Sequence, residues 1–101
     1  MHHALLVGRD AAEGLRLAAS WSAAGDTVTA VLLAEAAAIA RPGHADAGRI
    51  DQATAAGVDV RGHDEALRRR GISAPVAGVK PIDLDELADL VTVGADRAVW
   101  A

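Results

Sequence analysis

Charged and imidazole side chains follow three stretches of the sequence that have the apolar composition of buried strands. They are Arg9 and Asp10 after the first stretch, Glu35 after the second, and Arg61, His63 and Asp64 after the third. The carboxyl ends of neighbouring parallel strands meet at one edge of a sheet, which is where α/β proteins place their ligands. We therefore predict that these side chains line a polar pocket at that edge, suited to a small anion or another small molecule.

His63 is the central candidate because it joins a predicted strand to a predicted helix. The strand is the β-branched run at residues 58–60, and Gly62 and His63 form a predicted tight turn. The helix of residues 64–70 is stopped by Gly71. The free N–H groups of a first helical turn favour negative charge beside them. His63 is therefore predicted either to contact an anion or to fill a structural role.

The sequence lacks the common catalytic and cofactor-binding patterns. Cysteine is absent, which excludes thiol nucleophiles, disulfides and thiolate metal sites in this chain. The Rossmann glycines, the P-loop, the Gly-x-Ser-x-Gly nucleophile pattern and paired zinc-binding histidines are absent too. An enzyme that uses His63 as a general base, oriented by Asp64 or Glu35, is a third hypothesis that no nucleophile or metal shell supports. We therefore predict no catalytic residue, no metal and no cofactor.

The elements that must position these side chains alternate along the chain. Apolar runs predict strands at residues 1–7, 26–33 and 58–60, a short extended piece at 76–79 and a last strand at 98–100. Helical spacing and capping patterns predict helices at residues 10–24, 34–41, 44–56, 64–70 and 83–94. Such alternation requires right-handed crossovers, so we predict a three-layer α/β/α sandwich around a mainly parallel sheet of about five strands. We expect a single domain that spans residues 1–101.

The apolar fraction of the chain is high but is built from small side chains. Hydrophobic residues make up 51% of the 101 residues, yet Phe and Tyr are absent and alanine is abundant. Alanine buries little area, and burial stabilises by roughly 25 cal/mol per Å². We therefore expect a homo- or hetero-oligomer. Leu17, Trp21 and Trp100 are candidates for its interface, and the alternative for Leu17 and Trp21 is the edge of the core.

The charge of the chain narrows the range of partners. The formal net charge is −4 and the sequence pI is about 5.4, which argues against nucleic acid or an anionic membrane as the main partner. No apolar run approaches the roughly 20 residues that span a bilayer, and no signal-peptide pattern opens the chain. The expected location is the cytoplasm.

The order of these motifs resembles one protein family, the DsrE/DsrF-like superfamily, which includes the DsrEFH and TusBCD sulfur-relay subunits. The resemblance is carried first by the strand–turn–helix of residues 58–72 with its Arg-Arg-Gly ending. It continues through Leu5–Asp10, Leu15–Ala24, Val31–Ala36, Gly78–Val79, Asp83–Leu90 and Ala95–Arg97. Nearly the whole chain is covered, and the closing Trp100 is similar to the end of the DsrH/TusB branch.

The resemblance implies a DsrE-like α/β/α fold, assembly into trimers or hexamers with DsrE-like chains, and a role in moving sulfur. Active members carry persulfide on a cysteine at the start of the helix before Arg-Gly. His63 occupies that position, eight residues before Gly71, and imidazole cannot hold a persulfide sulfur. The predicted function is a non-catalytic scaffold or partner subunit of a sulfur-relay-type oligomer. The alternative is a small-anion or small-molecule binding module that uses the rim around His63.

Overall fold

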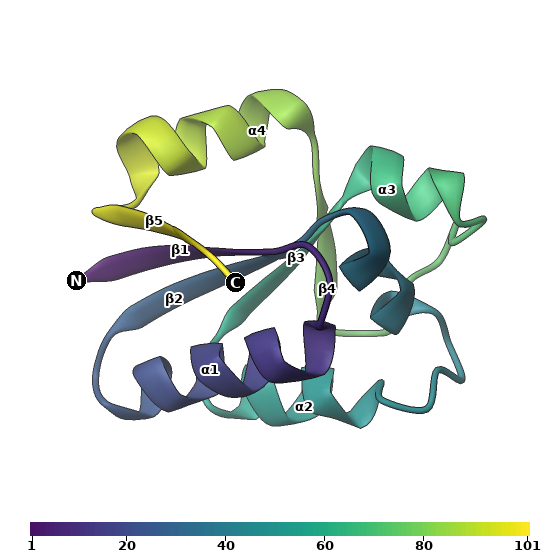
Figure 1. Ribbon diagram of the computed structural model, residues 1–101, viewed down its shortest axis with the longest axis horizontal. Helices are drawn as coiled ribbons and strands as arrows, with labels where there is room; N and C mark the ends of the chain where they lie inside the picture. Colours follow the sequence, from purple (N-terminus) through teal and green to yellow (C-terminus); the bar gives the residue numbers. More distant parts are fainter.

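The computed structural model describes residues 1–101 and contains one five-stranded sheet in which all neighbouring strands are parallel (Figure 1). The strands are β1 (His2–Val7), β2 (Thr27–Leu32), β3 (Asp59–His63), β4 (Val79–Ile82) and β5 (Arg97–Trp100). Their order across the sheet is β4-β3-β2-β1-β5. The predicted parallel α/β sandwich is therefore confirmed.

The helices lie on both faces of the sheet and at the carboxyl ends of its strands (Figure 1). They are α1 (Ala11–Ala23), the 3-10 helix η1 (Ala34–Ala40), α2 (Gly48–Ala55), α3 (Asp64–Arg69), α4 (Leu84–Asp89) and the π-helix η2 (Leu90–Gly94). Figure 1 shows α1 and α2 along one face and α4 with η2 along the other. None of the helices is long and apolar enough to cross a membrane.

Several boundaries differ from the sequence prediction. The extended piece predicted at 76–79 is the strand β4 at Val79–Ile82, and the helix predicted at 83–94 is divided into α4 and the π-helix η2. Strand β3 continues through His63, so α3 begins directly after the strand and the predicted tight turn is absent. The segment at 34–40 forms a 3-10 helix, which suits a short connection between β2 and the break at Pro42. The helix predicted from His44 begins only at Gly48, because residues 41–47 form turns and bends.

The two faces of the sheet are packed very unequally. Successive strand residues point to opposite faces, so Leu5 and Val7 of β1 enter one core while Leu6 enters the other. The core beneath α1 and α2 contains 20 buried hydrophobic residues, whereas the core beneath α4 contains three. No residue of α4 or η2 is buried. The first core thus supplies most of the burial that stabilises the fold.

Helix α4 is held by its cap as well as by packing. The Asp83 side chain accepts a hydrogen bond from the Glu86 backbone N–H at 2.8 Å, and the Glu86 side chain accepts from the Asp83 N–H at 3.1 Å. This reciprocal capping box was predicted from the sequence and is present in the structure. It fixes the start of α4 and therefore sets where its side chains lie over the sheet.

Helix α1 approaches β1 closely at a glycine. A Cβ atom added at Gly14 would lie 2.7 Å from one methyl group of Val7 and 2.8 Å from the other. Val7 is fully buried and its branched side chain has little freedom to move. The close contact between α1 and the sheet therefore requires a residue without a side chain at this position.

We expect Gly14→Ala to destabilise the protein although alanine favours helices. The added methyl group must displace Val7 or α1, and overpacking of this kind costs about 1–3 kcal/mol. Gly48→Ala is the matched control, since Gly48 lies in α2 and a Cβ atom added there would have no neighbour within 4 Å. In urea denaturation, the free energy of unfolding should be clearly lower for Gly14→Ala than for Gly48→Ala. Equal stability of the two variants would contradict the close contact.

Candidate functional site

The six predicted site residues do not line one pocket. Arg9, Asp10 and Glu35 lie together in a hollow of about 190 Å³ beside η1. His63 lines a second hollow, and Arg61 lines a third. The side chain of Asp64 forms an ion pair with Arg68 one helical turn later, with 3.6 Å between Oδ2 and Nη1. Convergence at the strand ends therefore holds for the backbone but not for the side chains.

The side chain of Arg61 is turned away from His63 because it pairs with Asp59 on the same strand. The Arg61 Nε–H donates to both carboxylate oxygens of Asp59 at 3.1 Å. Asp59 precedes Arg61 by two residues, so both side chains project from the same face of β3. The pairing draws the guanidinium back along the strand, away from the carboxyl end where His63 lies.

The hollow beside His63 has a volume of about 350 Å³ and lies against α3. Gly62 allows this helix to pack closely, because a Cβ atom there would lie 3.1 Å from Leu67 and 3.2 Å from Val79. Ala34, the first residue of η1, borders the hollow and has a φ of 48°. A non-glycine residue in the left-handed region is uncommon and is often found at functional sites.

Two arginines make this hollow cationic, and the sequence did not assign them to it. Arg69 and Arg70 line it together with one acid, Glu65, which pairs with Arg69 at 2.9 Å. Arg70 also donates weakly to the Ala66 carbonyl at 3.5 Å. The informative signal was the spacing of the arginine run, since Arg70 follows His63 by about two helical turns and so returns to the same side of α3.

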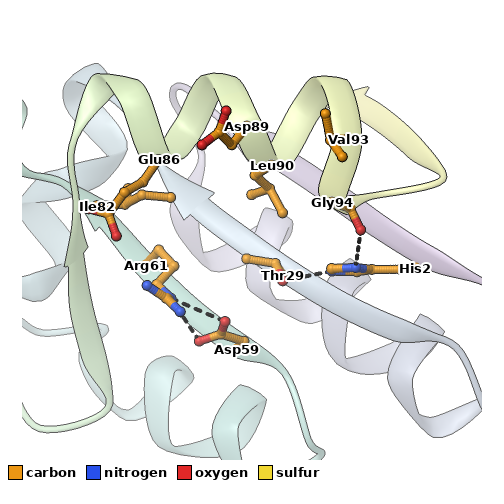
Figure 2. A pocket seen from close by; sticks show the side chains of 10 residues that line it. All are labelled: His2, Thr29, Asp59, Arg61, Ile82, Glu86, Asp89, Leu90, Val93 and Gly94. Carbon is orange, nitrogen blue, oxygen red and sulfur yellow. Dashed lines mark hydrogen bonds and ion pairs between the residues drawn. The ribbon is translucent and has the colours of Figure 1, made fainter.

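A larger hollow of about 630 Å³ lies between the sheet and the α4–η2 segment (Figure 2). We call it the α4 hollow. Its floor is formed by His2 of β1, Thr29 of β2, and Asp59 and Arg61 of β3. Its roof and walls are formed by Ile82, Glu86, Asp89, Leu90, Val93 and Gly94. Figure 2 shows Leu90 pointing down from the helix toward Thr29 on the floor.

Hydrogen bonds fix the orientation of His2 in this floor. Its Nδ1 lies 3.0 Å from the Gly94 carbonyl oxygen, which can only accept, so Nδ1 carries the proton. In the neutral ring Nε2 is then an acceptor and receives the Thr29 hydroxyl proton at 2.9 Å. Thr29 is only 5% exposed and lines the hollow. The same contacts tie η2 to the first two strands.

Of the residues in this floor, only Arg61 was predicted from the sequence to line a site. The signal was present in the strand alternation, because His2, Thr29 and Asp59 occupy positions that face α4. In the observed register Thr29 lies opposite Asp59, and His2 lies opposite Thr27. These polar positions become neighbours only once the strand order and register are known.

The predicted interface residues have different surroundings. Leu17 and Trp21 are partly buried and pack against the larger core. The Trp21 ring lies 5.0 Å from the ring of His3. Trp100 is 71% exposed and lies on the edge strand β5. Trp100 is therefore the predicted interface residue that leaves the most apolar surface in solvent.

Comparisons with known proteins identify the fold. No family model matches the sequence, and no curated protein matches it. The crystal structure of the ychN protein from E. coli is similar, with a TM-score of 0.77 and 22% identity over 100% of both chains. That protein has the DsrE-like fold, and at this level of identity the similarity is evidence for the fold alone. This chain therefore has a parallel α/β fold of the DsrE-like type.

Proposed function

We propose that this chain is a DsrE-like subunit that carries no sulfur itself and acts as a scaffold or partner in an oligomer of DsrE-like chains. The observation that carries the proposal is a DsrE-like fold with His63 at the junction of β3 and α3 and no cysteine in the sequence. A persulfide requires a thiol, so any sulfur chemistry would take place on a neighbouring subunit.

The distribution of buried side chains supports assembly. The core beneath α4 is small, and the exposed Trp100 lies on β5 at the edge of the sheet. Trp100 pairs with Leu6, which belongs to that small core, so its side chain is directed to the α4 side of the sheet. Edge strands carry unpaired backbone groups, and tryptophan is enriched at interfaces. A partner that covers β5 would bury both the unpaired backbone groups of this strand and the Trp100 side chain.

The hollow beside His63 supports the comparison with a sulfur site. Arg69 and Arg70 would stabilise a thiolate at position 63, because nearby cations lower the pKa of a thiol. The hollow would therefore favour a thiolate at this position, but the sequence contains no thiol.

We expect Trp100→Ser to shift the assembly toward smaller species. The substitution removes the largest exposed apolar side chain of the proposed interface. Leu84→Ser is the matched control, since Leu84 is 67% exposed but lies at the start of α4, away from β5. Native mass spectrometry should show trimers or hexamers for the wild type and the control. A strictly monomeric wild type that also fails to bind a DsrE-like chain would contradict the proposed scaffold role.

We expect His63→Cys to create an unusually reactive thiol. A pKa lowered by about one unit gives roughly tenfold more thiolate at neutral pH, and the reaction with iodoacetamide should quicken accordingly. Ser73→Cys is the control, because Ser73 is exposed in the loop after α3. With polysulfide as donor, intact-mass measurement should show a sulfur adduct that accumulates on the first variant. If the two thiols react equally fast, Arg69 and Arg70 do not lower the pKa of a thiol at position 63, and the comparison with a sulfur site loses its support.

A second candidate function is binding of a small anion in the hollow beside His63. The specific observation is that two arginines and one glutamate line it, which leaves an excess of positive charge. Arg9 and Arg61, which the sequence also suggested, line other hollows. An anion would therefore contact His63, Arg69 and Arg70.

We expect sulfate or phosphate to raise the melting temperature of the wild type and to do so less in Arg70→Gln. Ligand that binds only the folded state stabilises it in proportion to the logarithm of its concentration. Arg68→Gln is the control, since Arg68 pairs with Asp64 and does not line the hollow. A parallel series with sodium chloride at equal ionic strength shows how much of the shift in melting temperature comes from general charge screening and how much from binding of the anion. An equal response of both variants would exclude this hollow as the anion site.

A further inference from the structure

The α4 hollow has a floor that is more polar than a sheet face covered by helices usually is. A parallel sheet covered by helices on both faces is normally apolar on both. Here His2, Thr29 and Asp59 face α4 from three adjacent strands, and Arg61 follows on β3. Positions that break the local pattern without helping the core are expected at functional sites. This floor plays no part in the assembly proposed above or in the hollow beside His63.

The size and lining of the α4 hollow suit a small organic molecule. Its volume of about 630 Å³ lies within the range of ligand pockets, roughly 300–1,000 Å³. Leu90 and Val93 supply an apolar roof, and Ile82 closes one end (Figure 2). Val93 is 83% exposed, so its apolar surface is available to a ligand. A ligand seated beneath the roof would bury both side chains.

The charges of the lining select the sign of that ligand. Three carboxylates line the hollow, from Asp59, Glu86 and Asp89, against the single guanidinium of Arg61. Asp59 and Arg61 neutralise one another through their two hydrogen bonds. Glu86 and Asp89 remain as the excess charge. The Glu86 carboxylate also accepts the hydrogen bond from the Asp83 N–H, so Asp89, one helical turn further along, is the lining carboxylate that no protein group holds.

We propose that the α4 hollow binds a small organic cation, an amine or guanidinium group attached to an apolar body. The ammonium contacts the carboxylate of Asp89 at the mouth of the hollow, and Glu86 adds negative charge beside it. The apolar body lies beneath Leu90 and Val93, above Thr29. A carboxylate ligand is disfavoured, because Asp59 already occupies the Nε edge of Arg61 and the surrounding charge is negative.

Three probes with the same apolar body and different charge test the proposal: phenethylamine, phenethyl alcohol and phenylacetate. Amide NMR spectra of the full chain should show saturable shifts at Thr29 and at residues 90–94 with the amine at millimolar concentration. The alcohol should bind at least severalfold more weakly, and the acid should not bind. Amine affinity should also fall as salt is added, because the mouth is exposed to solvent.

Substitutions on α4 identify the carboxylate that makes the contact. Asp89→Asn should weaken phenethylamine binding by about tenfold, the expected loss for one charge-assisted hydrogen bond. Asp85→Asn is the matched control, since it removes the same charge from the same helix but lies outside the lining. Glu86→Gln provides a second loss variant that keeps an acceptor for the Asp83 cap.

Several results would overturn the proposal. They are equal binding of the amine and the alcohol, preference for the acid, absence of saturable shifts with any probe, and an equal loss in Asp85→Asn and Asp89→Asn. The oligomer experiments do not bear on this outcome, because Trp100 does not line the α4 hollow. Amine binding and assembly can therefore succeed or fail separately.

Discussion

The packing of α1 and α2 against one face of the sheet is the contact on which the rest of the structure depends. Nearly all of the buried apolar side chains lie on that side, and Gly14 lets α1 sit directly on Val7. Because this face supplies most of the hydrophobic stabilisation, the opposite face does not need a large apolar core. It can therefore hold polar strand residues, a helix without buried positions and a hollow between them.

The sequence was sufficient to predict the layers but not the asymmetry between them. Apolar runs such as Ala4–Val7 reveal a strand that is covered on both faces, and alternating strands and helices fix the parallel topology. The Asp83 capping box located α4. How tightly each helix packs depends on contacts between distant segments, such as that between His2 and Gly94, which no local pattern encodes.

The convergence of the candidate side chains on one pocket was predicted wrongly, for a reason that applies to other α/β domains. Convergence of strand ends is a property of the backbone, whereas a pocket is formed by side-chain directions. Arg61 lies two residues from His63, yet its pairing with Asp59 places it in another hollow. Arg69 and Arg70 enter the hollow beside His63 because β3 runs straight into α3 without the predicted turn. The position of Arg61 depends on side-chain geometry that spacing left open, whereas the spacing of Arg70 from His63 already indicated the second outcome.

Strand β3 therefore separates two hollows of opposite charge. The hollow beside His63 carries an excess of arginine, and the α4 hollow carries an excess of carboxylate. Arg61 lies between the two hollows, but its positive charge is neutralised by Asp59 on the same strand. Ligands of opposite sign would then be drawn to different ends of the same short strand without competing for one site. The two proposed binding sites would therefore be independent of one another, because each draws its charge from a different helix, α3 or α4.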